Sequence, residues 1–174
     1  MKTIVPLLIF ALTALTTMAQ TSIHEFKVES LDGGTINFAD FKGKKVLVVN
    51  TASKCGFTPQ YEDLEALHKQ HPDDLVIVGF PANNYGAQEP GTNTQIAEFC
   101  QQNYGVSFPM AAKVSVDGDD MHPLFAWLTA QPNPDFDGRI KWNFEKFLLD
   151  ENGKLVHRWR STANPTGKKI AEAL

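Results

Sequence analysis

Three stretches of the chain have the hydrophobic patterns of β-strands. Residues 23–38 alternate between apolar and polar side chains around an Asp32-Gly33-Gly34 turn, which predicts a β-hairpin. Residues 45–50 and 75–80 are continuous apolar runs, as expected for strands that are buried on both faces of a sheet. We therefore expect an N-terminal hairpin followed by two central strands.

The segment between the two apolar runs has the pattern of an amphipathic helix. Apolar residues recur at helical spacing from Tyr61 to His68, and Thr58 and Pro59 fit the N-cap and the first helical position. A strand, a helix and a strand of these lengths form a right-handed parallel βαβ unit.

The remainder of the chain adds helices and strands that complete a sheet. A second helix is predicted over residues 94–103, capped by Asn93 or Thr92, with Ile96, Phe99 and Cys100 on one face. The pattern then predicts a strand over residues 113–116, a helix over residues 123–130, a hairpin of residues 147–150 and 155–160, and a closing helix after Asn164-Pro165. This order predicts a thioredoxin-like α/β fold, with an N-terminal hairpin and a central mixed sheet flanked by helices.

The first 20 residues have the composition of a signal peptide. Lys2 precedes an apolar run, and Thr17 and Ala19 provide small residues for cleavage after Ala19. The run is too short for a stable membrane span. We predict that residues 1–20 are removed, that residues 21–174 form one domain, and that this domain is exported to the periplasm or secreted.

The net charge of the chain bears on which kinds of molecule it can bind. The formal net charge is −4, which argues against general nucleic-acid binding. Basic residues gather towards the C-terminal half, where a solvated face is the default explanation and a docking surface for an acidic partner is the alternative. We found no metal-ligand spacing or phosphate-binding motif, so neither a metal nor a cofactor is predicted.

Cys55 is the strongest candidate for a chemically reactive residue. It follows the apolar run of residues 45–50 and precedes a predicted helix start, where backbone N–H groups and the helix dipole stabilise a thiolate. Lys54 adds a positive charge beside it. The only other cysteine is Cys100, so a structural disulfide in an exported protein is the plain alternative.

Three loop segments, residues 50–58, 79–91 and 141–147, together resemble the signature segments of the glutathione peroxidase family. The resemblance runs from Phe26 to the C-terminal helix. It implies that Cys55 is the peroxidatic residue and that Gln88, Trp142 and Asn143 complete a catalytic tetrad. Amide and indole N–H groups can hold a thiolate and a peroxide without removing either charge.

The resemblance also assigns a role to Cys100, which matches the resolving cysteine of the cysteine-type, thioredoxin-dependent members. It implies a cycle in which Cys55 is oxidised to a sulfenic acid and then forms a transient disulfide with Cys100. A thioredoxin-like dithiol protein or glutathione would reduce that disulfide. Since Cys100 lies on the buried face of its predicted helix, we expect local unfolding to be needed.

Two departures from the family pattern carry information. Ala82 stands where members commonly have a cysteine, which removes one possible thiol. The segment between Trp127 and Lys141 is short, as in the monomeric, phospholipid-hydroperoxide type, which implies a monomer with an open site for hydrogen peroxide or bulkier organic peroxides.

Two other functions remain as alternatives. A thiol–disulfide oxidoreductase would normally need a Cys-x-x-Cys motif, which the chain lacks. A non-enzymatic binding domain held together by a Cys55–Cys100 bridge belongs to a different class, and thiol loss on addition of peroxide separates it from a peroxidase.

Overall fold

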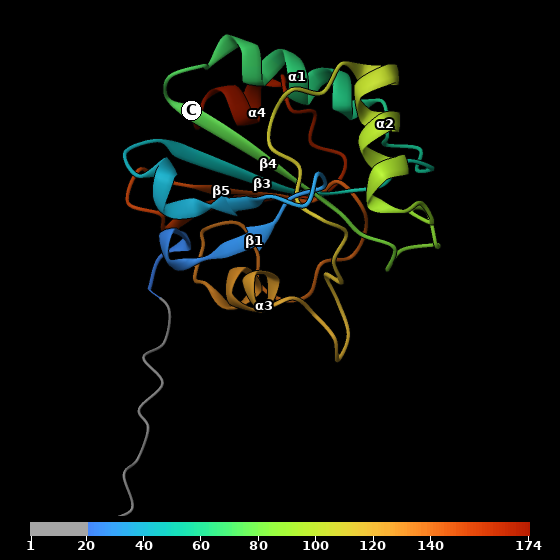
Figure 1. The fold of residues 1–174 in the computed structure, drawn as a ribbon. Helices are drawn as coiled ribbons and strands as arrows, with labels where there is room; N and C mark the ends of the chain where they lie inside the picture. The colour runs from blue at the N-terminus through green and yellow to red at the C-terminus, as the bar shows by residue number, and fades with distance from the viewer. Residues whose placement is uncertain (1–20) are drawn as a thin grey trace, which may run out of the picture.

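A four-stranded mixed sheet forms the centre of the computed structural model, which describes residues 21–174 (Figure 1). The strand order is β4-β3-β5-β6. Strand β3 (Lys45–Thr51) runs parallel to β4 (Leu75–Pro81) and antiparallel to β5 (Lys146–Leu149), which pairs with β6 (Leu155–Trp159). This arrangement confirms the predicted thioredoxin-like fold. The predicted signal peptide lies outside the described residues.

The predicted N-terminal hairpin is present as a separate two-stranded sheet. Strands β1 (Lys27–Glu29) and β2 (Thr35–Asn37) are antiparallel, and two short 3-10 helices, Ile23–Glu25 and Phe38–Phe41, flank them. Gly33 in the connecting turn has a φ of 82°, a value that glycine adopts without steric cost.

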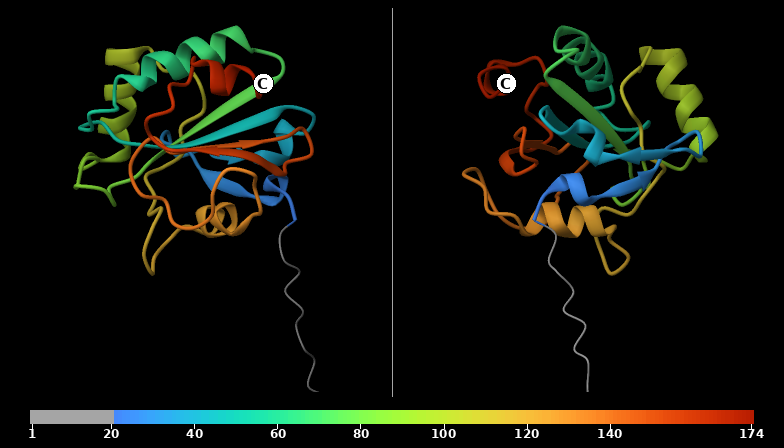
Figure 2. Two further views of the ribbon diagram at one scale, coloured as in Figure 1. Left: turned by 180° about the vertical axis from the view of Figure 1, so that it is seen from behind. Right: turned by 60° about the vertical axis from the view of Figure 1, so that its left-hand side comes forward.

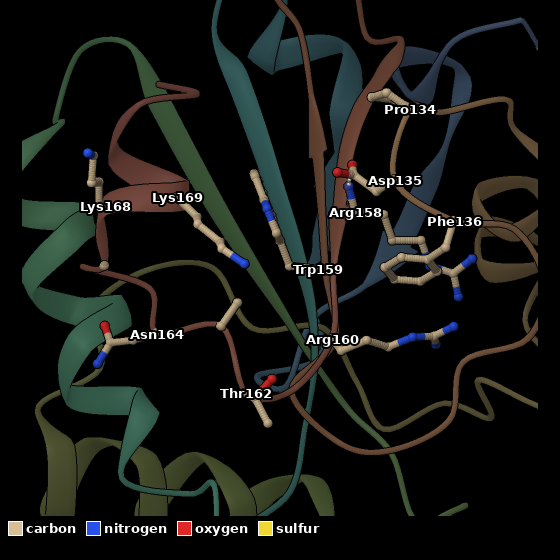
Figure 3. A pocket seen from close by; sticks show the side chains of 12 residues that line it. Pro134, Asp135, Phe136, Arg158, Trp159, Arg160, Thr162, Asn164, Lys168 and Lys169 are labelled. Atoms are coloured by element: carbon tan, nitrogen blue, oxygen red, sulfur yellow. Dashed lines mark hydrogen bonds between the residues drawn. The ribbon is translucent and has the colours of Figure 1, made fainter.

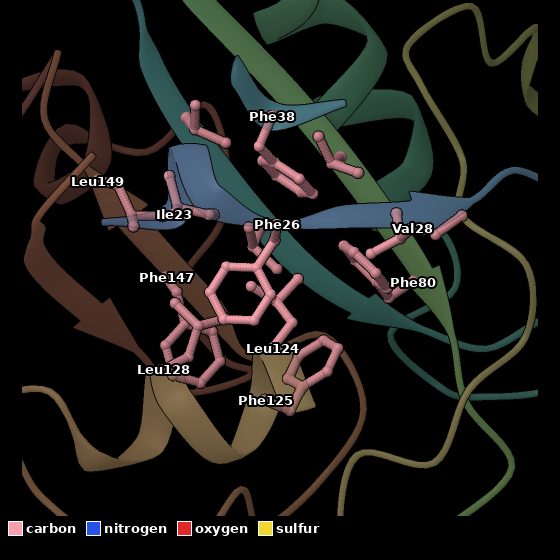
Figure 4. Close-up of a cluster of buried hydrophobic side chains, with 14 of the residues drawn as sticks. Ile23, Phe26, Val28, Phe38, Phe80, Leu124, Phe125, Leu128, Phe147 and Leu149 are labelled. Carbon is pink, nitrogen blue, oxygen red and sulfur yellow. The ribbon is translucent and has the colours of Figure 1, made fainter. Parts of the chain in front are cut away.

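Side chains from alternate positions of β3 enter two different cores. Val46 and Val48 join the hairpin and helix α3 (Pro123–Ala130) in one cluster. Figure 4 shows this cluster, in which Leu124 and Phe125 of α3 lie beneath the strands. Leu47 and Val49 enter the second cluster, so the continuous apolar run reflects burial on both faces, as predicted.

The second cluster lies under the helices of the other face. Helices α1 (Gln60–Gln70) and α4 (Lys168–Ala171) cover that face, whereas α3 and the hairpin cover the opposite one (Figures 1 and 2). Helix α2 (Asn93–Tyr104) stands beside the layers, and its buried residues are Ile96 and Cys100. Thr92 caps this helix through a capping box with Gln95, which resolves the choice between Asn93 and Thr92.

The strand predicted over residues 113–116 is wrong. The chain pairs earlier and only through isolated bridges, Gly79 with Met110 and Ser30 with Ala111. In the predicted range, Lys113 N donates to Asn93 Oδ1 at 3.0 Å and Val116 N donates to Asn84 Oδ1 at 2.9 Å, both side-chain amides. Only Val114 N donates to the backbone of β4, to Pro81 O at 3.0 Å. These amides replace the ladder partners that a strand would need.

Helix α1 begins one residue later than predicted. Pro59 occupies the N-cap position, and the Thr58 side chain makes no capping bond to the helix. Tight turns precede the helix, since Thr58 N donates to Cys55 O and Tyr61 N donates to Thr58 O. Within residues 21–174, no helix has the length and apolar character needed to cross a membrane.

Candidate active site

Cys55 lies in the turn that connects β3 to α1, and its side chain is 7% exposed. The Thr58 hydroxyl fixes this turn, because it accepts a hydrogen bond from Cys55 N at 2.9 Å and donates one to Ala52 O at 2.8 Å. The backbone N–H of Phe57 donates to Cys55 Sγ at 3.4 Å. A backbone N–H therefore points at the sulfur, as expected for a group that favours a thiolate.

Gln88 and Asn143 are brought together from different parts of the chain. Asn143 Nδ2 donates to Gln88 Oε1 at 2.9 Å. The backbone of Gln88 is also tied to the loop of Cys55, since Lys54 N donates to Gln88 O at 3.0 Å. Asn143 is fully buried, and its Oδ1 atom has no hydrogen-bond partner among the described residues.

Asn50 positions the segment that carries Trp142 and Asn143. Its Nδ2 atom donates to Trp142 O at 3.0 Å, and its Oδ1 atom accepts from Glu145 N at 2.9 Å. Phe144, between them, has a φ of 61°, a conformation unfavourable for a residue with a side chain. Sequence reasoning did not assign a role to Asn50, although a polar residue at the end of an apolar strand was a signal for one.

Trp142 lies at the surface and, at 39% exposure, is the exposed large hydrophobic residue within residues 21–174. The ring packs against Tyr85 with 5.8 Å between centroids, and the Tyr85 hydroxyl donates to Ile140 O at 2.7 Å. Tyr85 thus gives the indole a fixed neighbour while leaving it open to solvent. The roles of Cys55, Gln88, Trp142 and Asn143 in catalysis stay predictions at this stage.

Two buried charged residues follow directly in the same segment. Glu145 forms ion pairs with Arg158 and, at 2.6 Å, with Arg160. Lys146 Nζ donates to Gln60 Oε1 and, at 2.7 Å, to Ala163 O. Burial lowers the pKa of the Lys146 ammonium to about 7. These contacts anchor the segment to α1, to β6 and to the loop after β6, and sequence reasoning missed them.

Cys100 is buried at 2% exposure on the inner face of α2, as predicted. Both cysteines are free thiols and belong to the same hydrophobic cluster. The pKa of the Cys100 thiol is raised to about 11, chiefly by burial; the adjoining Tyr61 hydroxyl lowers it in part, and a charge on Glu89 raises it. In this conformation Cys100 is therefore protonated at neutral pH.

A cavity of about 660 Å³ lies between β6, α4 and the loop of residues 134–136 (Figure 3). None of the five predicted site residues lines it. Four basic side chains do, but three of them have acidic partners: Glu145 for Arg158 and Arg160, and Glu172 for Lys168. Part of the clustering of basic residues in the sequence thus corresponds to paired charges.

Comparison with known proteins identifies the family. The glutathione peroxidase family model matches residues 23–129, a range that includes Cys55, Gln88 and Cys100. The chain is 52% identical over 143 residues to the glutathione peroxidase-like peroxiredoxin gpx1 of Schizosaccharomyces pombe, covering 82% of this chain and 90% of that protein. It is 48% identical over 158 residues to the hydroperoxy fatty acid reductase gpx1 of Synechocystis sp., covering 87% and 94%.

Solved structures agree. The crystal structure of Trgpx in its apo form is 43% identical, with a TM-score of 0.69 and coverage of 88% of this chain and 95% of that one. A thiol:disulfide interchange protein from Chlorobium tepidum has a TM-score of 0.65 at 17% identity, with coverage of 88% and 94%, which shows the shared fold alone. The chain therefore belongs to the glutathione peroxidase family and is a peroxidase.

Proposed function

We propose that this chain reduces hydrogen peroxide and organic hydroperoxides through Cys55, with Gln88, Trp142 and Asn143 as the groups that bind the reacting atoms. The observation that carries the proposal is the direct hydrogen bond between the Gln88 and Asn143 side chains, which meet beside the loop of Cys55. Neutral amides from two loops meet there, which supports a shared role in binding the peroxide.

The first step is the oxidation of Cys55. Its thiolate attacks one peroxide oxygen, so an S–O bond forms and the O–O bond breaks. The departing oxygen takes a proton and leaves as water or an alcohol, and Cys55 becomes a sulfenic acid. Amide N–H groups aimed at the departing oxygen stabilise the charge that develops on it.

The second step joins Cys55 to Cys100. The Cys100 sulfur attacks the Cys55 sulfur, so an S–S bond forms and the sulfenic S–O bond breaks with release of water. With its pKa raised to about 11, buried Cys100 is a poor nucleophile, and its place inside α2 keeps it from the turn of Cys55. Opening of α2 supplies both access and a more acidic thiol.

A dithiol protein of the thioredoxin class then reduces the disulfide, and glutathione is the second candidate. The relatives named glutathione peroxidase-like peroxiredoxins favour the dithiol protein. For the peroxide, the Synechocystis relative is named a hydroperoxy fatty acid reductase, which supports organic hydroperoxides as substrates here. The proposal includes a monomeric enzyme, exported after removal of residues 1–20.

The test is a peroxide titration of the reduced protein followed by intact-mass analysis. One equivalent of peroxide is expected to remove two hydrogens from wild type and to add one oxygen to Cys100→Ser. Cys55→Ser is expected to leave the mass unchanged. Turnover with thioredoxin exceeding turnover with glutathione supports the dithiol reductant, and retained turnover in Cys55→Ser contradicts the proposal.

Separate experiments test the export of the protein and its monomeric state. Expression of the full chain in a bacterium with a periplasm, followed by mass spectrometry of the periplasmic fraction, is expected to give a protein that begins at Gln20 or Thr21. Size-exclusion chromatography with light scattering is expected to give the mass of one chain. An uncleaved cytoplasmic protein or a stable dimer contradicts these parts of the proposal.

A further inference from the structure

Glu89 is a buried carboxyl group that the proposed catalytic cycle does not yet use. It directly follows Gln88, and its side chain is fully shielded from solvent. Its Oε1 atom accepts a hydrogen bond of 2.6 Å from the Ser53 hydroxyl, whereas its Oε2 atom has no partner among the described residues. Burying a carboxyl oxygen without a partner costs free energy, so a structural role alone does not explain it.

The position of Glu89 connects the two cysteines. Ser53, which it binds, lies two residues before Cys55. Glu89 also lines a cavity with Ile96 and Phe99 of α2, the helix that holds Cys100. A charge on Glu89 raises the pKa of the Cys100 thiol and of the Tyr61 hydroxyl. The carboxyl group therefore stands between the loop of the peroxidatic cysteine and the inner face of the helix that holds the resolving cysteine.

A small cavity also meets Glu89 at this point. It has a volume of about 340 Å³ and lies between residues 53–54 of the Cys55 loop and the first turns of α2. Ile96 and Phe99 of α2 line it together with Glu89. This cavity leaves space for the first turns of α2 to move next to the carboxyl group.

The hydrogen bonds of Glu89 connect it to the segments around Cys55 and not to helix α2. Its backbone N–H donates to Asn83 Oδ1 at 2.8 Å, and its neighbour Gln88 accepts from Lys54 N. Helix α2 starts only at Asn93. These hydrogen bonds are expected to keep Glu89 with Ser53 and Cys55 when α2 opens.

We propose that Glu89 carries the proton in the step that joins Cys100 to Cys55, an inference that rests on the proposed two-cysteine cycle. The Glu89 carboxylate accepts the proton of the Cys100 thiol while the Cys100 sulfur attacks the Cys55 sulfur. The S–S bond forms, the S–O bond of the sulfenic acid breaks, and the departing hydroxide takes the same proton and leaves as water. The carboxylate is regenerated, and no external acid or base is consumed.

The electrostatic surroundings of Glu89 suit a group that both accepts and returns a proton. Burial raises the pKa of its carboxyl group above the ordinary value, and Ser53, Lys113 and Lys54 lower it in part. Cys100 and Tyr61, which face it from α2 and α1, are neutral thiol and phenol groups at neutral pH. A carboxyl group with a raised pKa is a stronger base than an exposed one.

The test compares Glu89→Gln with Ser53→Ala in rapid-quench experiments. After one equivalent of peroxide, intact mass separates the sulfenic acid from the disulfide over time. Glu89→Gln keeps the shape and an oxygen for the Ser53 hydroxyl but cannot carry the proton, so the ratio of the resolving rate to the oxidation rate is expected to fall tenfold or more. Ser53→Ala removes the hydrogen bond but keeps the carboxyl group, so it is expected to change this ratio much less.

The pH dependence of the resolving rate gives a second readout. It would not change if Glu89 only held the Cys55 loop in place through Ser53. In wild type and Ser53→Ala, the resolving rate is expected to rise with pH as Glu89 loses its proton, and this inflection is expected to vanish in Glu89→Gln. Glu89→Asp is expected to restore it in part. A wild-type rate in Glu89→Gln, or equal losses in Glu89→Gln and Ser53→Ala, overturns the proton-carrier role. A wild type that never forms the disulfide overturns the two-cysteine cycle, and this inference with it.

Discussion

The Asn143 amide donates a 2.9 Å hydrogen bond to Gln88 Oε1 across 55 positions of sequence. Gln88 follows β4 and Asn143 precedes β5, and these strands are the two neighbours of β3. The loop of Cys55 follows β3 itself. The order of strands in the sheet therefore gathers three distant segments at one end of the central strand, as expected for a site in an open α/β sheet.

Replacing either amide is expected to slow the oxidation of Cys55. Asn143→Ala and Gln88→Ala each remove a donor for the departing peroxide oxygen and break the bond between the two side chains. Loss of one such donor typically lowers a rate by about 100-fold. Stopped-flow measurement of Cys55 oxidation checks this, with Gln70→Ala at the end of α1 as a control. Wild-type rates in both variants contradict an active role for the amides.

Trp142→Phe separates the indole N–H from the packing of the ring. The phenyl ring still contacts Tyr85, so the fold of the loop is expected to persist. Loss of the N–H donor is expected to lower the oxidation rate about tenfold or more. Trp142→Ala serves as the comparison. If only the alanine variant is slow, the tryptophan acts through its packing.

Gly86→Ala is expected to damage the site by a small, local displacement. Gly86 has a φ of 64°, and an added Cβ would lie 3.4 Å from the Gln88 side chain. The conformational strain alone costs about 1 kcal/mol of unfolding free energy. Gly43→Ala is a matched control, because its φ is 84° and its Cβ would meet nothing within 4 Å. Both variants should lose similar stability, but only Gly86→Ala should react slowly with peroxide.

Titration of Cys100 predicts a loss of stability in alkali. Its thiol pKa is raised in the folded protein from 9.0 to about 11, so the neutral thiol favours folding below pH 9 and this advantage disappears between pH 9 and 11. The change amounts to about 2–3 kcal/mol. Urea unfolding of Cys55→Ser and Cys55→Ser/Cys100→Ala at pH 8 and 11 measures it. Equal pH dependence in the two variants contradicts the assignment to Cys100.

Glu145→Gln is expected to destabilise the segment behind the active site. It leaves the buried Arg158 guanidinium and its neighbour Arg160 without their carboxylate, a loss of about 3–5 kcal/mol for a buried pair. Glu172→Gln, which breaks the exposed ion pair with Lys168, is expected to cost less than about 1 kcal/mol. Thermal or urea unfolding compares them, and equal effects would contradict the importance of burial.

The sequence predicted most of the framework because hydrophobic burial leaves a periodic signal. The run around β3 indicated a strand buried on both faces, and the structure divides its side chains between two cores. The strand predicted at residues 113–116 was wrong because Asn93 and Asn84 satisfy the N–H groups of Lys113 and Val116, which leaves only Val114 bonded to β4. A side-chain partner leaves no trace in local periodicity.

The residues of the candidate site also differ in how far the local sequence could predict them. Cys55 could be found from its place after a strand, whereas Gln88, Trp142 and Asn143 needed the family resemblance, because a lone amide or indole has no local signature. Asn50 and Glu89 were missed, since their importance comes from contacts with distant segments. Long-range polar contacts are the part of a site that single-sequence patterns do not encode.

If Cys100 resolves Cys55 as proposed, its burial has a consequence for the loss of activity at high peroxide. In the proposed cycle, the sulfenic acid on Cys55 either waits for α2 to open or meets a second peroxide molecule and becomes a sulfinic acid. Helix opening has a rate that does not depend on peroxide, whereas the second oxidation accelerates in proportion to peroxide. The fraction of enzyme lost per turnover is therefore expected to rise gradually with peroxide, and the stability of one helix sets the concentration at which the two rates are equal.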